Sequence, residues 1–152
     1  MIYICLLFSL TGMAQKKQLQ AVRDQIKSGK ELTKAENTLR GLLVDSASKK
    51  NNKIWLLLCD ALTKQYEQGN EKLYLKQKYD TAALFTVTRK LYDVMSRFDS
   101  LDAQPDAKGR VRAKYRAKHA EFLNSIRPNL FNGGSYFIHK KDYNTAFDYY
   151  SD

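Results

Sequence analysis

The chain has few of the residues that metal-binding and disulfide-rich proteins depend on. It contains two cysteines and two histidines in 152 residues. His119 and His139 have no cysteine or histidine at ligand spacing around them, so we expect no metal site and read both rings as facing solvent or a helix end. If the apolar N-terminus that carries Cys5 is removed, Cys59 stays alone and no internal disulfide is possible.

Catalytic motifs are also missing. The sequence has no glycine-rich phosphate loop, no nucleophile elbow and no paired carboxylates placed for acid–base chemistry. Gly133 and Gly134 are not followed by a third glycine or by Lys-Ser/Thr, so close helix packing explains this pair better than phosphate binding. We therefore predict a protein that is not an enzyme and has neither a cofactor nor a small-molecule substrate.

Turn-forming residues are scarce as well, with two prolines and seven glycines. Their scarcity favours long helices over a turn-rich β fold. Apolar residues recur at helical spacing, and we expect helices over 17–28, 31–45, 52–74, 84–98, 110–126, 130–139 and 144–150. Pro128 either kinks the helix before it or opens a new one. The sequence thus predicts an all-α protein built from antiparallel helical hairpins.

The N-terminal segment has the pattern of a secretory signal. Residues 2–11 are almost wholly apolar, and Gly12 and Ala14 are small residues just before a cut at Gln15. The run is shorter than the ~20 residues that span a bilayer. No basic residue precedes Lys16, so either the true start lies upstream or the signal is atypical; a buried first helix is the alternative. We expect a signal peptide over 1–14, a helical domain over 15–152 and no transmembrane span after removal.

The last two helices carry a regular alternation of large and small residues. Small side chains let two helices approach closely, and large ones fill the space around the crossing. The positions that follow this alternation are Leu130, Gly134, Phe137, Tyr143, Ala146 and Tyr150. This segment resembles a tetratricopeptide repeat, a helix–turn–helix unit. Weaker matches are anchored on Ala35 and Ala82, at separations of 47 and 64 residues rather than the ideal of about 34. An unrelated helical bundle remains the alternative.

The resemblance extends to exported tetratricopeptide-repeat proteins of Gram-negative bacteria over residues 72–150. It implies a periplasmic or cell-surface scaffold that binds a protein or peptide. We expect the binding surface to include Tyr66, Asn70, Tyr136 and His139. Each repeat buries one face on the next, so the aromatic residues of 143–150 lead us to expect a fragment of a longer protein.

A basic run is the rival functional signal in a chain of net charge +10. Six basic residues occupy alternate positions: Lys108, Arg110, Arg112, Lys114, Arg116 and Lys118. A strand would place them on one face that could follow a phosphate backbone, whereas a helix would spread them. Val111 and Tyr115 fit helical spacing, so we expect a helix here. The alternatives are a solvated surface or a module that binds polyanions, namely anionic glycans, lipid headgroups or nucleic acid; we disfavour nucleic acid.

Overall fold

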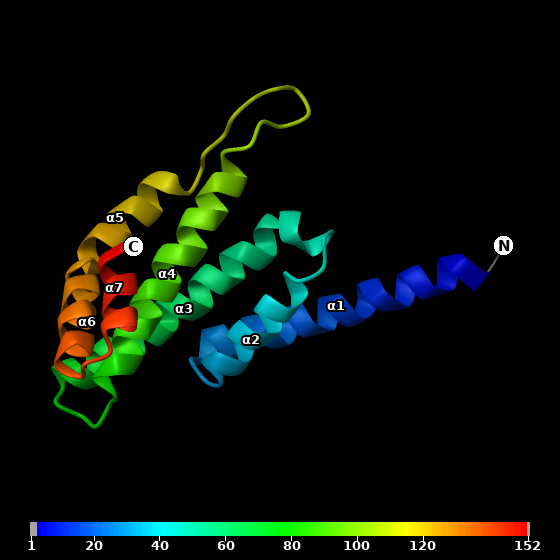
Figure 1. Ribbon diagram of the computed structural model, residues 1–152. Helices are drawn as coiled ribbons and strands as arrows, with labels where there is room; N and C mark the ends of the chain where they lie inside the picture. Colours follow the sequence, from blue (N-terminus) through cyan, green and yellow to red (C-terminus); the bar gives the residue numbers. More distant parts are fainter. Residues whose placement is uncertain (1–2, 152) are drawn as a thin grey trace. The chain divides into compact units, whose positions relative to one another are not determined.

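A computed structural model describes the backbone of residues 3–151 and the side chains of residues 12–151. This part of the chain is all-α and contains no strand, as the sequence predicts (Figure 1). Its helices are α1 (Tyr3–Ser28), α2 (Leu32–Leu42), α3 (Asn52–Tyr74), α4 (Thr81–Asp102), α5 (Arg116–Ile126), α6 (Pro128–His139) and α7 (Tyr143–Ser151), with a short 3-10 helix at Ser48–Lys50. Pro128 therefore opens a new helix.

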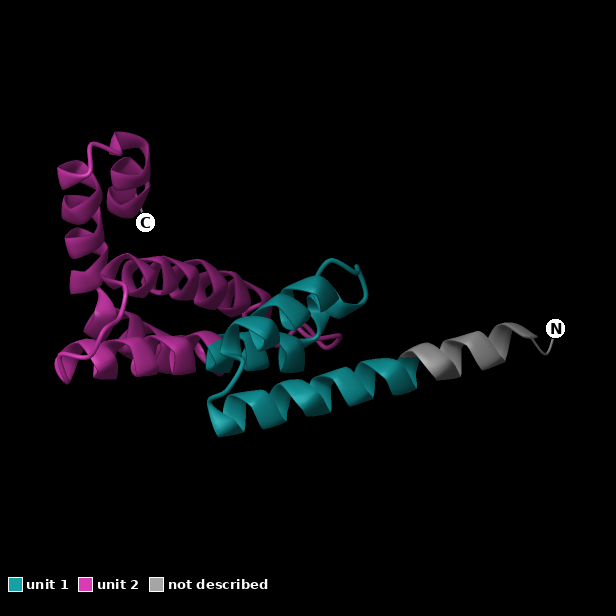
Figure 2. Ribbon diagram, turned by 90° about the horizontal axis from the view of Figure 1, so that it is seen from below, with its two compact units in different colours: residues 1–61 teal, residues 62–152 magenta. Residues whose placement is uncertain are grey.

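The chain divides into two compact units, residues 1–61 and residues 62–152, and the division falls within α3 (Figure 2). In the first unit α1 packs against α2. Gly29 has a φ of 68°, which glycine adopts readily, and the chain leaves α1 there. Val22 on α1 and Ala35 and Leu39 on α2 are buried.

The N-terminal predictions fall largely outside the described side chains. The backbone of α1 begins at Tyr3, well before the helix expected from residue 17. The side chains of residues 1–11 are not described, so the signal peptide over 1–14 stays a prediction. Among the described residues, no helix combines the length and the apolar character needed to cross a membrane.

The second unit has its core where α6 meets α4 and α7. Phe85 on α4, Leu130 on α6 and Tyr149 on α7 are buried together. Gly133 lets the α7 helix approach, because a Cβ atom at this position would lie 2.5 Å from the Tyr149 ring. Ala146 is buried, as the repeat pattern predicts, whereas Ala82 on α4 is only half-buried.

The structure corrects the helix expected over 110–126. Residues 110–115 form part of the loop between α4 and α5, and the helix begins only at Arg116. Carboxylates hold this loop in place: Asp106 accepts backbone N–H groups from Lys108 and Arg110, and Asp102 accepts the N–H of Lys114 at 2.7 Å. These hydrogen bonds satisfy amide groups in a non-helical conformation and so compete with the helix.

His119 does not face solvent, which was one of the two alternatives expected for it: its ring is buried near the start of α5. His119 Nδ1 lies 2.6 Å from Asp99 Oδ1, and the ring stacks on Tyr115 and packs against Phe98. The carboxylate belongs to the end of α4 and the imidazole to the first turns of α5. This contact therefore joins the end of α4 to the start of α5, the two helices that the loop connects.

Candidate functional site

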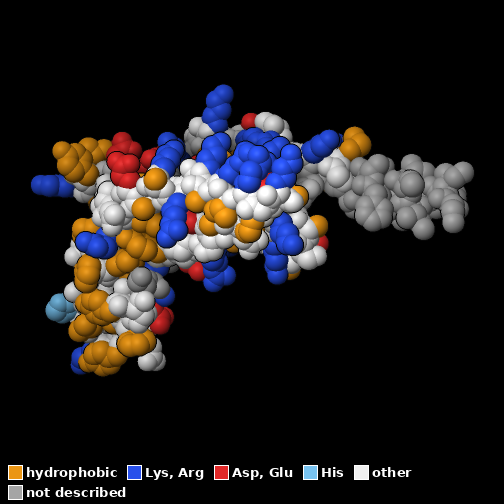
Figure 3. Space-filling view, turned by 90° about the horizontal axis from the view of Figure 1, so that it is seen from above, with side chains coloured by type: hydrophobic (Ala, Val, Ile, Leu, Met, Phe, Trp, Pro, Cys, Tyr) orange, Lys and Arg blue, Asp and Glu red, His pale blue; other side chains and the backbone are white. Residues whose placement is uncertain are grey.

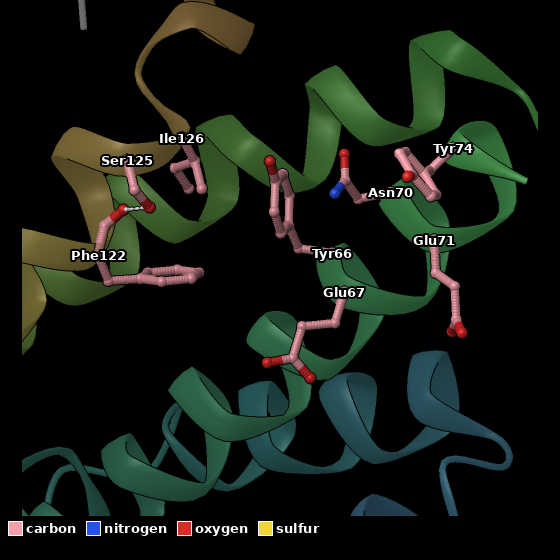
Figure 4. Close-up of a pocket in the computed structure, with 8 residues that line it drawn as sticks. All are labelled: Tyr66, Glu67, Asn70, Glu71, Tyr74, Phe122, Ser125 and Ile126. Atoms are coloured by element: carbon pink, nitrogen blue, oxygen red, sulfur yellow. Dashed lines mark hydrogen bonds between the residues drawn. The ribbon is translucent and has the colours of Figure 1, made fainter.

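One face of α3 carries aromatic and polar side chains at helical spacing. Tyr66, Asn70 and Tyr74 are four residues apart and therefore lie along the same side of the helix. Glu67 and Glu71 follow two of them directly and also line the groove, with side chains that point away from the Tyr66 ring (Figure 4). Tyr74 is 84% exposed, so most of its side chain is open to solvent.

Helix α5 forms the other side of a groove with a volume of about 520 Å³. Phe122 reaches from α5 toward Tyr66, and the two rings meet edge to face with centroids 6.2 Å apart (Figure 4). Ser125 and the buried Ile126 complete this wall. Such a volume lies in the lower part of the ~300–1,000 Å³ range of small-ligand pockets, so the groove has room for one or two side chains and not for a whole helix.

Tyr66 is held in position by a hydrogen bond to a third helix. Asn129 Nδ2, on α6, donates to the phenol oxygen of Tyr66 at 2.8 Å. Burial raises the pKa of the Tyr66 phenol above its ordinary value, while the bond from Asn129 acts in the opposite direction. The phenol is therefore neutral at physiological pH, and its ring offers a fixed apolar surface beside Phe122.

The charged residues that line the groove are both acidic, in a chain whose net charge is +10. The Oε2 atom of Glu67 lies 3.6 Å from Nζ of Lys64. An exposed ion pair of this kind contributes about 0–1 kcal/mol to the free energy of unfolding. Glu71 is exposed and makes no ion pair with the residues that the structure describes. The groove therefore combines two carboxylates with three aromatic rings, a surface that attracts a cation.

The structure separates the four residues predicted to bind a partner. Tyr66 and Asn70 both line the groove. Tyr136 is half-buried on α6, where its ring packs against Phe85 at 5.8 Å. His139 is exposed at the end of α6. The latter two lie outside the groove, and a role for any of the four in binding stays a prediction.

The six basic residues also fall into two sets. Lys108, Arg110, Arg112 and Lys114 lie in the loop between α4 and α5, and Arg116 and Lys118 lie in the first turn of α5. All six are exposed. The Arg110 guanidinium lies 3.0 Å from Asp106, so this charge is partly neutralised.

The outer surface of α6 and α7 is strongly apolar (Figure 3). Its exposed residues are Phe131, Ile138, Tyr143, Phe147 and Tyr150. Tyr149, on the same helix as Tyr150, turns inward and is only 3% exposed.

Of the eight residues that line the groove, the sequence pointed only to Tyr66 and Asn70 as binding residues. Glu67, Glu71 and Phe122 were not singled out, although Glu67 and Glu71 are four residues apart on the helix that carries Tyr66. Their helical spacing was the available signal for one wall. The pairing of α3 with α5 had no such signal, because the two walls are separated by the whole of α4.

Among the described residues, no group of three or more His, Cys, Asp or Glu side chains could hold a metal ion.

Comparison with known proteins adds no relative. No family model, no curated protein and no solved structure matches this chain.

Proposed function

We propose that this chain is a non-enzymatic helical scaffold that binds a protein partner through the groove between α3 and α5. The proposal includes the tetratricopeptide-like character of the hairpins and export from the cytoplasm, which rest on the residue patterns of 130–150 and 1–14. The observation that carries the binding role is the combination of Glu67 and Glu71 with exposed or half-buried aromatic rings in one groove.

The residues that line the groove indicate which side chains of a partner it would bind. A lysine or arginine side chain would lay its apolar stem against Phe122 and bring its cation near Glu67 and Glu71. The exposed ring of Tyr74 adds a cation–π surface, an interaction worth about 0.5–1 kcal/mol at exposed sites. The fitting partner is therefore a peptide segment with a basic residue beside an apolar one.

The test uses short random peptides displayed on phage and selected against the full chain. We expect the enriched peptides to share a Lys or Arg next to an apolar residue. Glu71→Gln should weaken these peptides severalfold, because the substitution removes a charge and keeps the shape of the side chain. Glu121→Gln is the matched control, since Glu121 is an exposed acid on α5 that does not line the groove.

Three results would reject the proposal. The first is the absence of any enriched peptide, and the second is enrichment of acidic or purely apolar peptides. The third is an equal effect of Glu71→Gln and Glu121→Gln, because that outcome would trace binding to overall charge instead of the groove.

A further inference from the structure

The loop between α4 and α5, residues 103–115, is rich in basic residues and contributes none of the residues that line the groove. It extends beyond the ends of the two helices that it connects (Figure 1). Residues 104–114 are all exposed. Together with the first turn of α5, it carries the six basic residues of 108–118 against one acid, Asp106.

The structure orders this loop while leaving its charges accessible. Asp106 accepts the backbone N–H groups of Lys108 and Arg110 at 2.8 and 3.0 Å, which closes a tight turn. The Asp106 carboxylate is therefore engaged by these two backbone N–H groups and by the Arg110 guanidinium. Lys108 and Arg112 have no ion-pair partner among the described residues, so their charges remain available.

An apolar side chain sits among these charges. Val111 is 60% exposed, although valine is usually buried. Lys108, Arg110, Arg112 and Lys114 flank it at alternate positions in the sequence, so the loop combines one exposed apolar side chain with four exposed cations.

We propose that this loop binds the surface of a membrane that contains anionic phospholipids. A projecting loop can reach a flat surface without a groove. Basic residues close to such a surface each strengthen binding about fivefold, and Val111 would enter the headgroup region. A dissolved single-stranded nucleic acid would instead favour stacking aromatics, and the loop supplies only Tyr115, which is packed against Phe98 and His119. The inference does not depend on the groove.

The experiment measures sedimentation of the full chain with vesicles of phosphatidylcholine alone or mixed with phosphatidylglycerol. We expect binding only to the mixed vesicles, weakened by salt. The double substitution Lys108→Gln and Arg112→Gln should lower the partition coefficient about 25-fold. The control, Lys50→Gln with Lys53→Gln, removes the same charge from exposed residues elsewhere and should change it by less than about threefold.

A second variant separates a membrane from a dissolved polyanion. Val111→Ser keeps every charge and should lower the partition about fivefold, because the apolar side chain no longer enters the lipid. The proposal is overturned if mixed vesicles do not bind, or if the two double variants lose binding equally. It is also overturned if Val111→Ser binds like the wild type, or if the chain binds a single-stranded oligonucleotide but not the vesicles.

Discussion

The close approach of α6 and α7 depends on Gly133, and replacing this residue by alanine gives a sharp test of the packing. A Cβ atom there would lie 2.5 Å from Cε1 of Tyr149 and 3.1 Å from the Cβ of Phe85. The Tyr149 ring has little room to move. It is 3% exposed, stacks on Phe137 at 5.4 Å and lies under the guanidinium of Arg89.

Two opposing terms set the size of the effect. Alanine is favoured over glycine within a helix by about 1 kcal/mol. Overpacking a filled core costs about 1–3 kcal/mol. Because the neighbouring ring is fixed on several sides, we take the upper part of that range and expect Gly133→Ala to lower the free energy of unfolding by about 2 kcal/mol.

Two other glycines provide the comparison. At Gly134 the conflicting ring is Tyr150, which is 48% exposed and can turn away, so alanine there should be close to neutral. At Gly41, in α2, a Cβ meets nothing within 4 Å, and alanine should stabilise by about 0.5–1 kcal/mol.

The free energies are measured by urea denaturation followed by circular dichroism. Fluorescence of the single tryptophan, Trp55, provides a separate probe for the unit that holds Gly41. A Gly133→Ala variant as stable as the wild type, or equal changes in stability for all three glycine variants, would contradict this packing.

Three more predictions concern the contacts around α5. His119→Ala should lower stability by about 2 kcal/mol in denaturation experiments, because it leaves the carboxylate of Asp99 partly buried without its partner. Tyr92→Phe removes a hydrogen bond to an α5 carbonyl and should cost about 1 kcal/mol by the same measurement. Backbone hydrogen bonds from Arg110 and Lys108 lower the pKa of Asp106. The stability that these bonds give the loop is therefore fully present above the ordinary pKa of an aspartate carboxyl, and it is lost as pH falls through the lowered pKa. Amide exchange of residues 108–110 should therefore accelerate in acid beyond its intrinsic rate, and unchanged protection would contradict this.

The all-α class and most of the helices could be predicted because apolar spacing alone determines them. The spacing also shows that α3 runs through Gly69, at a cost of about 1 kcal/mol in helix propensity. The reason for tolerating this glycine could not be predicted: the ring of Tyr79 packs onto it, and a Cβ would lie 2.6 Å away. Such a contact depends on tertiary packing, which leaves no periodic signal.

The basic loop shows why the helix predicted over 110–126 begins only at Arg116. Val111 and Tyr115 fit helical spacing, but the backbone hydrogen bonds to Asp102 and Asp106 favour a turn. Asp99, Asp102 and Asp106 lie close together in the sequence. Their particular partners, Lys114 twelve residues from Asp102 and His119 twenty residues from Asp99, follow only from the pairing of α4 with α5.

The groove between α3 and α5 is tested most directly by nuclear magnetic resonance of the full chain during titration with an enriched basic peptide. The largest shifts are expected on residues 66–74 and 122–126, and the Glu71→Gln variant should need severalfold more peptide to reach them. Shifts confined to the apolar surface of 131–150 or to the loop of 103–115 would contradict it.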